Sequence, residues 1–202
     1  MKKYLIKTIY FFGLIAILFD ATLIFRNLMM TTLGRAEMDS EALNLPAPEL
    51  VGGPWINTPG GKEINLAGRR GKVTIVEFWT FACGNCLANL PAYENWQKQF
   101  ADEDVVVIGV HTPETESERV TANVARRVKQ LGITYPVLVD QEHANWNRWQ
   151  VEAWPTVYLV DKQGRIRYRW VGELNYRNAG GEAKLGQLVK RLLKEDSVKA
   201  LQ

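Results

Sequence analysis

Short apolar runs and amphipathic stretches alternate along the chain from residue 48 onward. Continuous runs of β-branched and aromatic residues predict strands at residues 73–79, 105–110, 135–139, 156–160 and 166–171. Apolar residues spaced three and four positions apart predict helices at residues 86–101, 145–151 and 182–194, and a solvent-facing helix at 115–131. Strands that alternate with helices form a mainly parallel sheet covered on both faces, closed here by an antiparallel pair. The pattern therefore predicts an α/β sandwich.

Residues 55–66 predict an additional β-hairpin at the N-terminal end of this sandwich. Pro59, Gly60 and Gly61 lie between two strand-like stretches, and all three are residue types that favour turns. We expect the two stretches to pair with each other across this turn.

Residues 1–28 place three lysines before a long apolar run, which is the pattern of an export signal. The run extends from Thr8 to Phe25, and its only charge is Asp20. It just reaches the length that a bilayer core requires, and no small-residue cleavage site follows it. We therefore expect a retained transmembrane helix, with a cleaved signal or a buried helix as alternatives. The lysines would keep the N-terminus cytoplasmic and place the rest of the chain outside.

The composition of residues 29–202 predicts a tether, a folded domain and a short tail. Residues 29–47 carry mixed polar residues and run into Pro46-Ala47-Pro48, which is typical of a tether. We expect residues 48–196 to form the folded domain and residues 197–202 to form a tail. The chain would then be a single-pass inner-membrane protein whose domain lies in the periplasm or an equivalent extracytoplasmic space.

Composition also excludes several classes of protein. Two cysteines in 202 residues cannot hold together a disulfide-framework mini-protein. The 25 Lys and Arg residues against 22 Asp and Glu give a formal charge of +3, and no basic stripe indicates nucleic-acid binding. The sequence contains no phosphate-binding loop and no dinucleotide glycine fingerprint. No cofactor is expected.

The sequence Cys83-Gly84-Asn85-Cys86 follows a hydrophobic strand and opens an amphipathic helix. Unpaired amides and partial positive charge at a helix N-terminus stabilise a thiolate there. Two intervening residues let both sulfurs come within bonding distance across the first helical turn. We expect Cys83, at the exposed end, to attack a partner disulfide and Cys86 to resolve the mixed disulfide. The pair therefore predicts a redox-active disulfide.

Glu77 is a carboxylic acid in an otherwise apolar strand, six residues before Cys83. An unpaired carboxyl in a strand buried on both faces is costly, so its pKa should rise and it should take or give protons. The alternative is a glutamate on an edge strand that points to solvent.

Several segments resemble thioredoxin-fold proteins, most closely the DipZ-like and TlpA/ResA-like extracytoplasmic branch. The likeness rests on residues 78–91 around the cysteines and extends through residues 109–114, 131–136 and 154–161. It implies a thioredoxin-like three-layer sandwich in which residues 115–139 form an inserted helix and strand. It also implies that the Trp154-Pro155 bond is cis and faces the cysteines. Glu77 would lie beneath them and accept the proton of the resolving thiol through water.

Five residues elsewhere in the sequence are expected beside the motif. We expect Trp79, Phe81 and Trp154, together with Pro155, to form an apolar surface that binds an extended partner segment. His111 ends the strand parallel to the Glu77 strand, at the same edge of the sheet as the cysteines. It is a candidate for tuning the thiolate, although a lone histidine at a strand end also fits a satisfied turn residue.

These residues predict a membrane-anchored thiol-disulfide oxidoreductase. The acid and the family likeness favour a reductant of the cytochrome c maturation or repair type, acting on disulfide-bearing exported proteins. Thiols outside the cytoplasm are otherwise oxidised, so an electron-donating membrane thiol protein is expected as the second partner. The alternative is a Cu(I)-binding, metallochaperone-like module that uses Cys83 and Cys86. A structural zinc site needs four ligands, and only His111 and His143 would remain to complete one.

Overall fold

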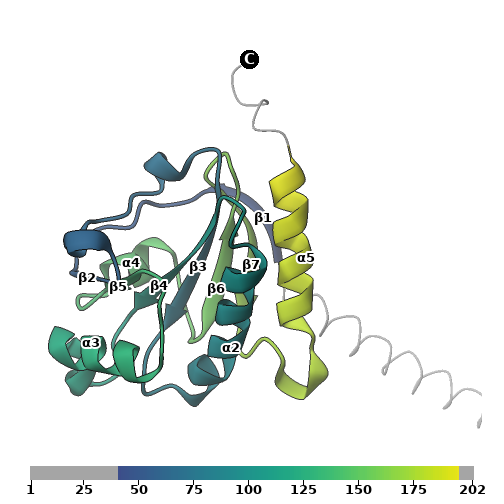
Figure 1. Cartoon of the computed structure of the whole chain (residues 1–202). Coiled ribbons are helices and arrows are strands. Elements are labelled where there is room, and N and C mark those ends of the chain that lie inside the picture. The colour runs from purple at the N-terminus through teal and green to yellow at the C-terminus, as the bar shows by residue number, and fades with distance from the viewer. Residues whose placement is uncertain (1–40, 196–202) are drawn as a thin grey trace, which may run out of the picture. The chain divides into compact units, whose positions relative to one another are not determined.

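The structure, a computed structural model, describes residues 41–195 (Figure 1). These residues form a mixed seven-stranded sheet with the strand order β1-β7-β6-β3-β4-β5-β2. The strands are β1 (Glu41–Pro46), β2 (Trp55–Ile56), β3 (Val73–Trp79), β4 (Val105–His111), β5 (Val137–Val139), β6 (Thr156–Val160) and β7 (Arg165–Val171). The described α-helices are α2 (Gly84–Gln99), α3 (Thr121–Gln130), α4 (Ala144–Arg148) and α5 (Gly181–Lys194). Short 3-10 turns connect them at η1 (Pro59–Gly61), η2 (Ala67–Arg69), η3 (Glu116–Arg119) and η4 (Tyr176–Asn178).

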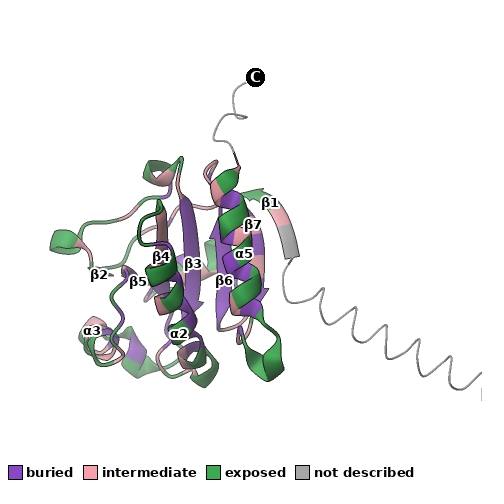
Figure 2. Cartoon of the chain, turned by 45° about the vertical axis from the view of Figure 1, so that its right-hand side comes forward, coloured by how far each residue is buried: buried purple, intermediate pink, exposed green. Residues whose placement is uncertain are grey.

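Strand β3 lies at the centre of the sheet and is buried along its whole length (Figure 2). It runs parallel to β4 and antiparallel to β6, and the register places Glu77 beside Gly109 and Val157. Side chains alternate between the two faces of a strand, so Glu77 shares a face with Ile75 and Trp79. The core on that face contains residues of α2, α3 and α5. Glu77 therefore lies on the side of the sheet that α2 covers.

The opposite face of the sheet packs on a second core. Val76 and Phe78 of β3 join Leu50, Trp55 and Trp149 there. The rings of Phe78 and Trp149 have centroids 5.8 Å apart. Apolar layers on both faces confirm the predicted α/β sandwich. The prediction of a mainly parallel sheet is wrong: β4 pairs parallel with β3 and β5, whereas the other four strand pairs within residues 41–195 are antiparallel, because β1 and β2 join the sheet as antiparallel edge strands.

Most predicted elements are confirmed. The strands at residues 73–79 and 156–160 have the predicted bounds, and β4 and β7 are each one residue longer than predicted. The segment expected as an inserted helix and strand forms η3, α3 and β5, and β5 extends the sheet beyond β4.

The predicted hairpin at residues 55–66 is wrong. Strand β2 pairs antiparallel with β5, with Trp55 opposite Leu138, and the Pro-Gly-Gly segment forms the 3-10 turn η1. Burial explains why β2 pairs with β5 and not across the turn, because Trp55 and Leu138 belong to the same core. Asn57 adds to it by donating side-chain hydrogen bonds to the carbonyls of Ile133 (2.8 Å) and Tyr135 (3.1 Å).

The expected tether is also corrected at its end. Its residues 41–46 form β1, an edge strand that pairs antiparallel with β7 and places Leu45 opposite Ile166. Leu43 packs on the core of that side. Pairing satisfies main-chain groups that β7 would otherwise expose as a sheet edge. The folded domain therefore begins before residue 48.

No helix within residues 41–195 is long and apolar enough to cross a membrane. The transmembrane helix expected at residues 1–28, the first part of the expected tether and the tail at 197–202 lie outside the described residues.

Candidate active site

The Cys-Gly-Asn-Cys segment follows the loop after β3 and begins helix α2. Cys83 is the N-cap of α2, and its Sγ accepts a hydrogen bond from the Cys86 N–H at 3.3 Å. This bond satisfies one of the amides that a helix start leaves without a partner. Both cysteines are free thiols, Cys83 partly exposed and Cys86 buried. Of the two sulfurs, that of Cys83 is the accessible one.

The thiol of Cys86 is held protonated by its surroundings. Burial raises the pKa of Cys86 well above its ordinary value, and a hydrogen bond with Cys83 raises it further. A hydrogen bond with the backbone of Thr80 acts in the opposite direction. The negative charge of an ionised Glu77 also raises the pKa of this thiol. Cys86 therefore needs a proton acceptor before it can attack.

Glu77 is fully buried in the middle of β3, as its position in an apolar strand predicts. The Tyr135 hydroxyl donates a hydrogen bond to Glu77 Oε1 at 3.1 Å. Oε2 has no hydrogen-bond partner among residues 41–195. Burial raises the pKa of Glu77 well above its usual range, and the bond from Tyr135 offsets only part of this. An acid in this state holds its proton more readily than an exposed glutamate and is a candidate for proton transfer.

Gly109 on β4 makes room for this carboxyl. A Cβ at that position would lie 2.7 Å from Glu77 Oε1 and 3.1 Å from both Trp79 Nε1 and Tyr135 Cε2. Real side-chain atoms do not approach so closely, so no other residue fits without displacing these groups. Glycine at this strand position is therefore tied to the acid beside it.

The Trp154-Pro155 bond is cis, as the resemblance implies. It comes directly before β6, and the Pro155 carbonyl accepts a hydrogen bond from the Gly172 N–H at 2.8 Å. Trp154 is partly exposed and packs on the same core as Cys83 and Phe81. Its indole lies 4.2 Å from that of Trp146, centroid to centroid.

Trp79 does not belong to the exposed surface predicted for partner binding. It is 1% exposed, and its ring meets that of His111 edge-on at 5.1 Å. As the last residue of the fully buried strand β3, it lies beneath the loop that leads to Cys83. Of the four residues predicted for this surface, Phe81 and Trp154 are partly exposed, whereas Pro155 is buried like Trp79.

His111 is enclosed between aromatic rings and one carboxylate. Its ring lies 5.1 Å from Trp79 and 5.4 Å from Phe81, and its Nε2 is 3.8 Å from Glu118 Oε1. Burial lowers the pKa of His111 to about 4, although the charge of Glu118 acts against this shift. His111 is therefore neutral at neutral pH.

Glu118 is a buried residue of the site that the sequence analysis does not identify. It is 0% exposed, and its carboxylate accepts five hydrogen bonds from two neighbouring loops. Burial alone would raise the pKa of Glu118, but these bonds outweigh burial and lower it. The available signal is the capping box from Thr115 to Glu118. The apolar spacing predicts only a solvent-facing helix there.

The AhpC/TSA family matches residues 44–169, which is more than half of the chain. The chain belongs to the AhpC/TSA family. Over 131 residues it is 42% identical to DipZ of Mycobacterium tuberculosis, covering 64% of this chain and 19% of DipZ. The chain thus spans less than a fifth of that relative's length. It is also 29% identical over 154 residues to the thiol-disulfide oxidoreductase YkuV of Bacillus subtilis, covering 76% of this chain and 97% of YkuV.

Solved structures of thioredoxin-like proteins share the fold. The thioredoxin-like superfamily protein SPOA0173 aligns with a TM-score of 0.67 at 26% identity, covering 75% of this chain and 98% of that one. A thiol:disulfide interchange protein from Chlorobium tepidum TLS aligns with a TM-score of 0.57 at 26% identity, covering 76% and 99%. The chain therefore has a thioredoxin-like fold, and the relatives and solved structures that it resembles include proteins named as thiol-disulfide oxidoreductases.

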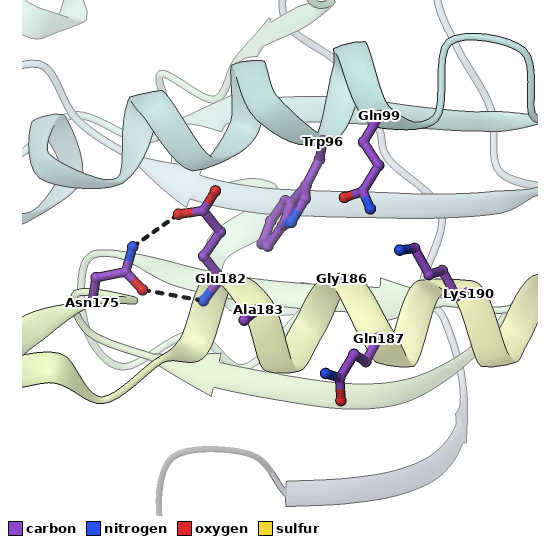
Figure 3. Close-up of a pocket in the computed structure, with 8 residues that line it drawn as sticks. All are labelled: Trp96, Gln99, Asn175, Glu182, Ala183, Gly186, Gln187 and Lys190. Carbon is purple, nitrogen blue, oxygen red and sulfur yellow. Dashed lines mark hydrogen bonds between the residues drawn. The ribbon is translucent and has the colours of Figure 1, made fainter.

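A groove of about 340 Å³ lies between α2 and α5 (Figure 3), and neither cysteine nor Glu77 is among its lining residues. Its lining comes from Trp96 and Gln99 at the far end of α2 and from polar residues of α5 and the turn before it. Gly186 lets the two helices approach, since a Cβ there would lie 3.3 Å from Trp96 Nε1. We therefore attribute the groove to the packing of the two helices. No group of three or more His, Cys, Asp or Glu residues within 41–195 could hold a metal ion.

Proposed function

We propose that this chain is a membrane-tethered reductant that transfers two electrons from its Cys83/Cys86 pair to disulfides of exported proteins. One observation carries the proposal. A partly exposed sulfur caps α2, and the second sulfur is buried with a hydrogen bond to it. The buried acid Glu77 acts electrostatically on the second sulfur. This is an arrangement for attack, resolution and proton removal.

The reaction proceeds in two exchanges. The Cys83 thiolate attacks one sulfur of the partner disulfide, and the partner's other sulfur leaves as a thiolate that takes a proton from water. Glu77, through a water, accepts the proton of Cys86, and the Cys86 thiolate attacks Cys83 Sγ. The partner's second sulfur then leaves. The partner gains two electrons and two protons, and the chain is left with a Cys83-Cys86 disulfide.

A partner segment would bind at the partly exposed side chains of Phe81 and Trp154, beside the buried Pro155. The Gly172 N–H donates to the Pro155 carbonyl, and we expect an extended partner to pair with the main chain of Trp154 before it. Val171 is 39% exposed and lies opposite Thr156 in the sheet, so it adds apolar area beside the cis bond. A site of this kind recognises the extended conformation of a disulfide-bearing segment and does not select one particular sequence.

The lysines and apolar run within residues 1–28 support an inner-membrane anchor with the domain in the periplasm. In that compartment the oxidised pair must be re-reduced, so an electron-donating membrane thiol protein completes the cycle. The proposed tasks are cytochrome c maturation or repair of misoxidised secreted proteins.

The deciding experiment measures the reduction potential of the full chain in detergent by equilibration with glutathione. A potential near that of thioredoxin, about −270 mV, supports a reductant, whereas one near about −120 mV indicates an oxidant and overturns the proposed direction. A titration of the reduced chain with Cu(I) tests the metallochaperone alternative. Tight binding that is lost in Cys83→Ser, together with no reduction of a test disulfide, would favour that alternative.

A further inference from the structure

The Glu118 carboxylate joins two loops on either side of the redox motif. Its Oε1 accepts hydrogen bonds from the Thr80 hydroxyl and from the Ala82 N–H at 3.0 Å, both in the loop between β3 and α2. Its Oε2 accepts from the N–H groups of Glu114 (3.0 Å) and Thr115 (2.9 Å) and from the Thr115 hydroxyl at 3.1 Å. The loop before Cys83 is therefore fastened to the turn after β4 by one side chain.

Each oxygen of this carboxylate faces a main-chain N–H that can only donate. Ala82 supplies it on the Oε1 side, and Glu114 and Thr115 supply it on the Oε2 side. Glutamine has one carbonyl oxygen and one NH₂ group, so in either orientation it would turn a donor toward a donor. A buried N–H without an acceptor costs about 1–3 kcal/mol. The site therefore needs an ionised carboxylate and not merely a polar side chain of this size.

Thr80 connects the carboxylate to both cysteines. The Thr80 hydroxyl donates to Glu118, while its carbonyl accepts a hydrogen bond from the Cys83 N–H at 3.3 Å. The Thr80 backbone also hydrogen-bonds with Cys86. Thr80 is 0% exposed, so these contacts are shielded from competing water. The conformation of one residue thus fixes the main chain at the attacking cysteine and a hydrogen bond at the resolving one.

We propose that Glu118 is a positioning residue of the redox site, which holds Thr80 and Ala82 so that Cys83 and Cys86 keep their reactive arrangement. This inference rests on the proposed thiol-disulfide exchange. Within residues 41–195 no hydrogen bond joins Glu118 to either sulfur, so it acts through Thr80 and does not itself contact the reacting atoms. The arrangement assigns a function to a carboxylate that the exchange reaction does not consume.

The test compares four variants of the full chain in detergent. Glu118→Gln removes the charge, and Thr80→Val removes only the hydroxyl that donates to Oε1. Thr115→Val removes a hydroxyl on the Oε2 side and serves as the matched control for Thr80→Val. Glu116→Gln is the control for Glu118→Gln, because Glu116 lies in the same turn with its side chain 91% exposed. Circular dichroism first identifies a temperature at which all the variants are folded.

Three measurements follow at that temperature: the rate of attack on a test disulfide, the equilibrium with glutathione, and amide hydrogen exchange at Ala82. We expect Thr80→Val and Glu118→Gln to slow the attack about tenfold, because small displacements of reacting groups reduce rates steeply. Thr80→Val should move the glutathione equilibrium toward the disulfide by about threefold, since the hydrogen bond between the Thr80 backbone and the reduced Cys86 sulfur is weakened. Exchange at Ala82 should become faster in Glu118→Gln. Glu116→Gln should match the unaltered chain in all three. Thr115→Val should change them less than Thr80→Val does, because two main-chain N–H groups still donate to Oε2.

The proposal is overturned if folded Thr80→Val exchanges electrons with the same rate and equilibrium as the unaltered chain. It is equally overturned if Thr115→Val slows attack as much as Thr80→Val, because the effect would then not run through the loop before Cys83. Should Glu118→Gln fail to fold, Thr80→Val decides the matter, since it removes one hydrogen bond. If the unaltered chain reduces no protein disulfide, the proposed function fails. The glutathione equilibrium and the Ala82 exchange rate still decide the positioning role.

Discussion

The Tyr135 hydroxyl donates a hydrogen bond of 3.1 Å to the Glu77 carboxyl inside the core, although the two residues lie 58 positions apart in the chain. Both side chains are fully buried or nearly so. Burial raises the pKa of Tyr135 well above its usual range, and the charge of Glu77 raises it further. The tyrosine therefore remains a donor throughout the physiological range, and the carboxyl keeps one oxygen unpaired by any residue within 41–195. That oxygen is the one we assign to proton transfer.

Replacing Glu77 with glutamine tests this assignment. The amide oxygen would still accept the Tyr135 hydrogen bond but could not take a proton, so we expect Glu77→Gln to fold and to resolve mixed disulfides about 10²-fold more slowly near neutral pH. The measurement is the rate of release of a disulfide-linked test peptide. Attack by Cys83 should keep its rate, which serves as the internal control. Unchanged release would remove Glu77 from the mechanism.

The same variant makes a prediction about stability. The pKa of Glu77 is raised in the folded chain, so between its ordinary value of 4.5 and the raised value the folded state holds a proton that the unfolded state has lost. Stability then falls with increasing pH, by up to about 1.4 kcal/mol per pH unit. Glu77→Gln should abolish this slope and be the more stable protein at about pH 8. Denaturant unfolding across the pH range measures it, and parallel curves for the two proteins would contradict the raised pKa.

Gly109→Ala tests the packing beside the acid. The added methyl would lie 2.7 Å from Glu77 Oε1, and Trp79 and Tyr135 leave it no other space. We expect a loss of about 1–3 kcal/mol in the free energy of unfolding. Gly84→Ala is the matched control, because nothing lies within 4 Å of a Cβ at that position. The measurement is the change in melting temperature of each variant. A change for Gly109→Ala equal to that for Gly84→Ala would show that the Glu77 carboxyl is free to move.

Local sequence pattern predicts the parts of this fold that depend on local chemistry. The apolar run of β3 determines both its bounds and the burial of Glu77, and the cysteine spacing places Cys83 at the start of α2. The hairpin prediction fails because the pairing of β2 depends on a core contact with Leu138, far away in the sequence. A turn signal indicates where the chain bends but not which strand it then meets.

The site is predicted less completely than the fold, because it too depends on contacts between residues far apart in the sequence. The sequence pattern places Trp79 and Glu118 at exposed positions, yet both are buried. Glu118 has the capping-box spacing of an ordinary exposed helix start. Only the fold brings Thr80 and Ala82 to its Oε1, the oxygen that does not take part in the capping box. A partner contributed by another loop leaves no mark in the local pattern.

Trapping distinguishes the roles of the two cysteines. In Cys86→Ser the resolving thiol is absent, so mixed disulfides through Cys83 should accumulate at least about tenfold over the unaltered chain. Cys83→Ser retains only the buried sulfur and should capture almost nothing. Non-reducing electrophoresis followed by peptide mapping gives the linkage. Partners attached to Cys86 in the second variant would reverse the proposed order of attack.

The buried histidine predicts how the domain responds to acid. The pKa of His111 falls from an ordinary 6.5 to about 4 on folding, because burial disfavours the charged ring. Between these values the unfolded chain binds a proton that the folded chain does not, so stability is complete above about pH 6.5 and is lost as the pH falls toward 4. The loss from this group alone is about 3 kcal/mol. His111→Leu should remove most of it, as measured by denaturant unfolding at several pH values.

The control for this prediction is the other histidine of the chain. His143 is partly exposed at the start of α4 with a φ of 57°, a conformation that asparagine tolerates, so His143→Asn is a matched histidine substitution away from the buried ring. Glu118 also loses its charge at low pH, but its pKa lies below 4.5, so its contribution disappears only at more acidic pH than the first part of the His111 transition. If His111→Leu and the unaltered chain lose stability in parallel between pH 6.5 and 4, the ring is protonated in the folded state. Its enclosure by Trp79 and Phe81 would then be looser than the structure shows.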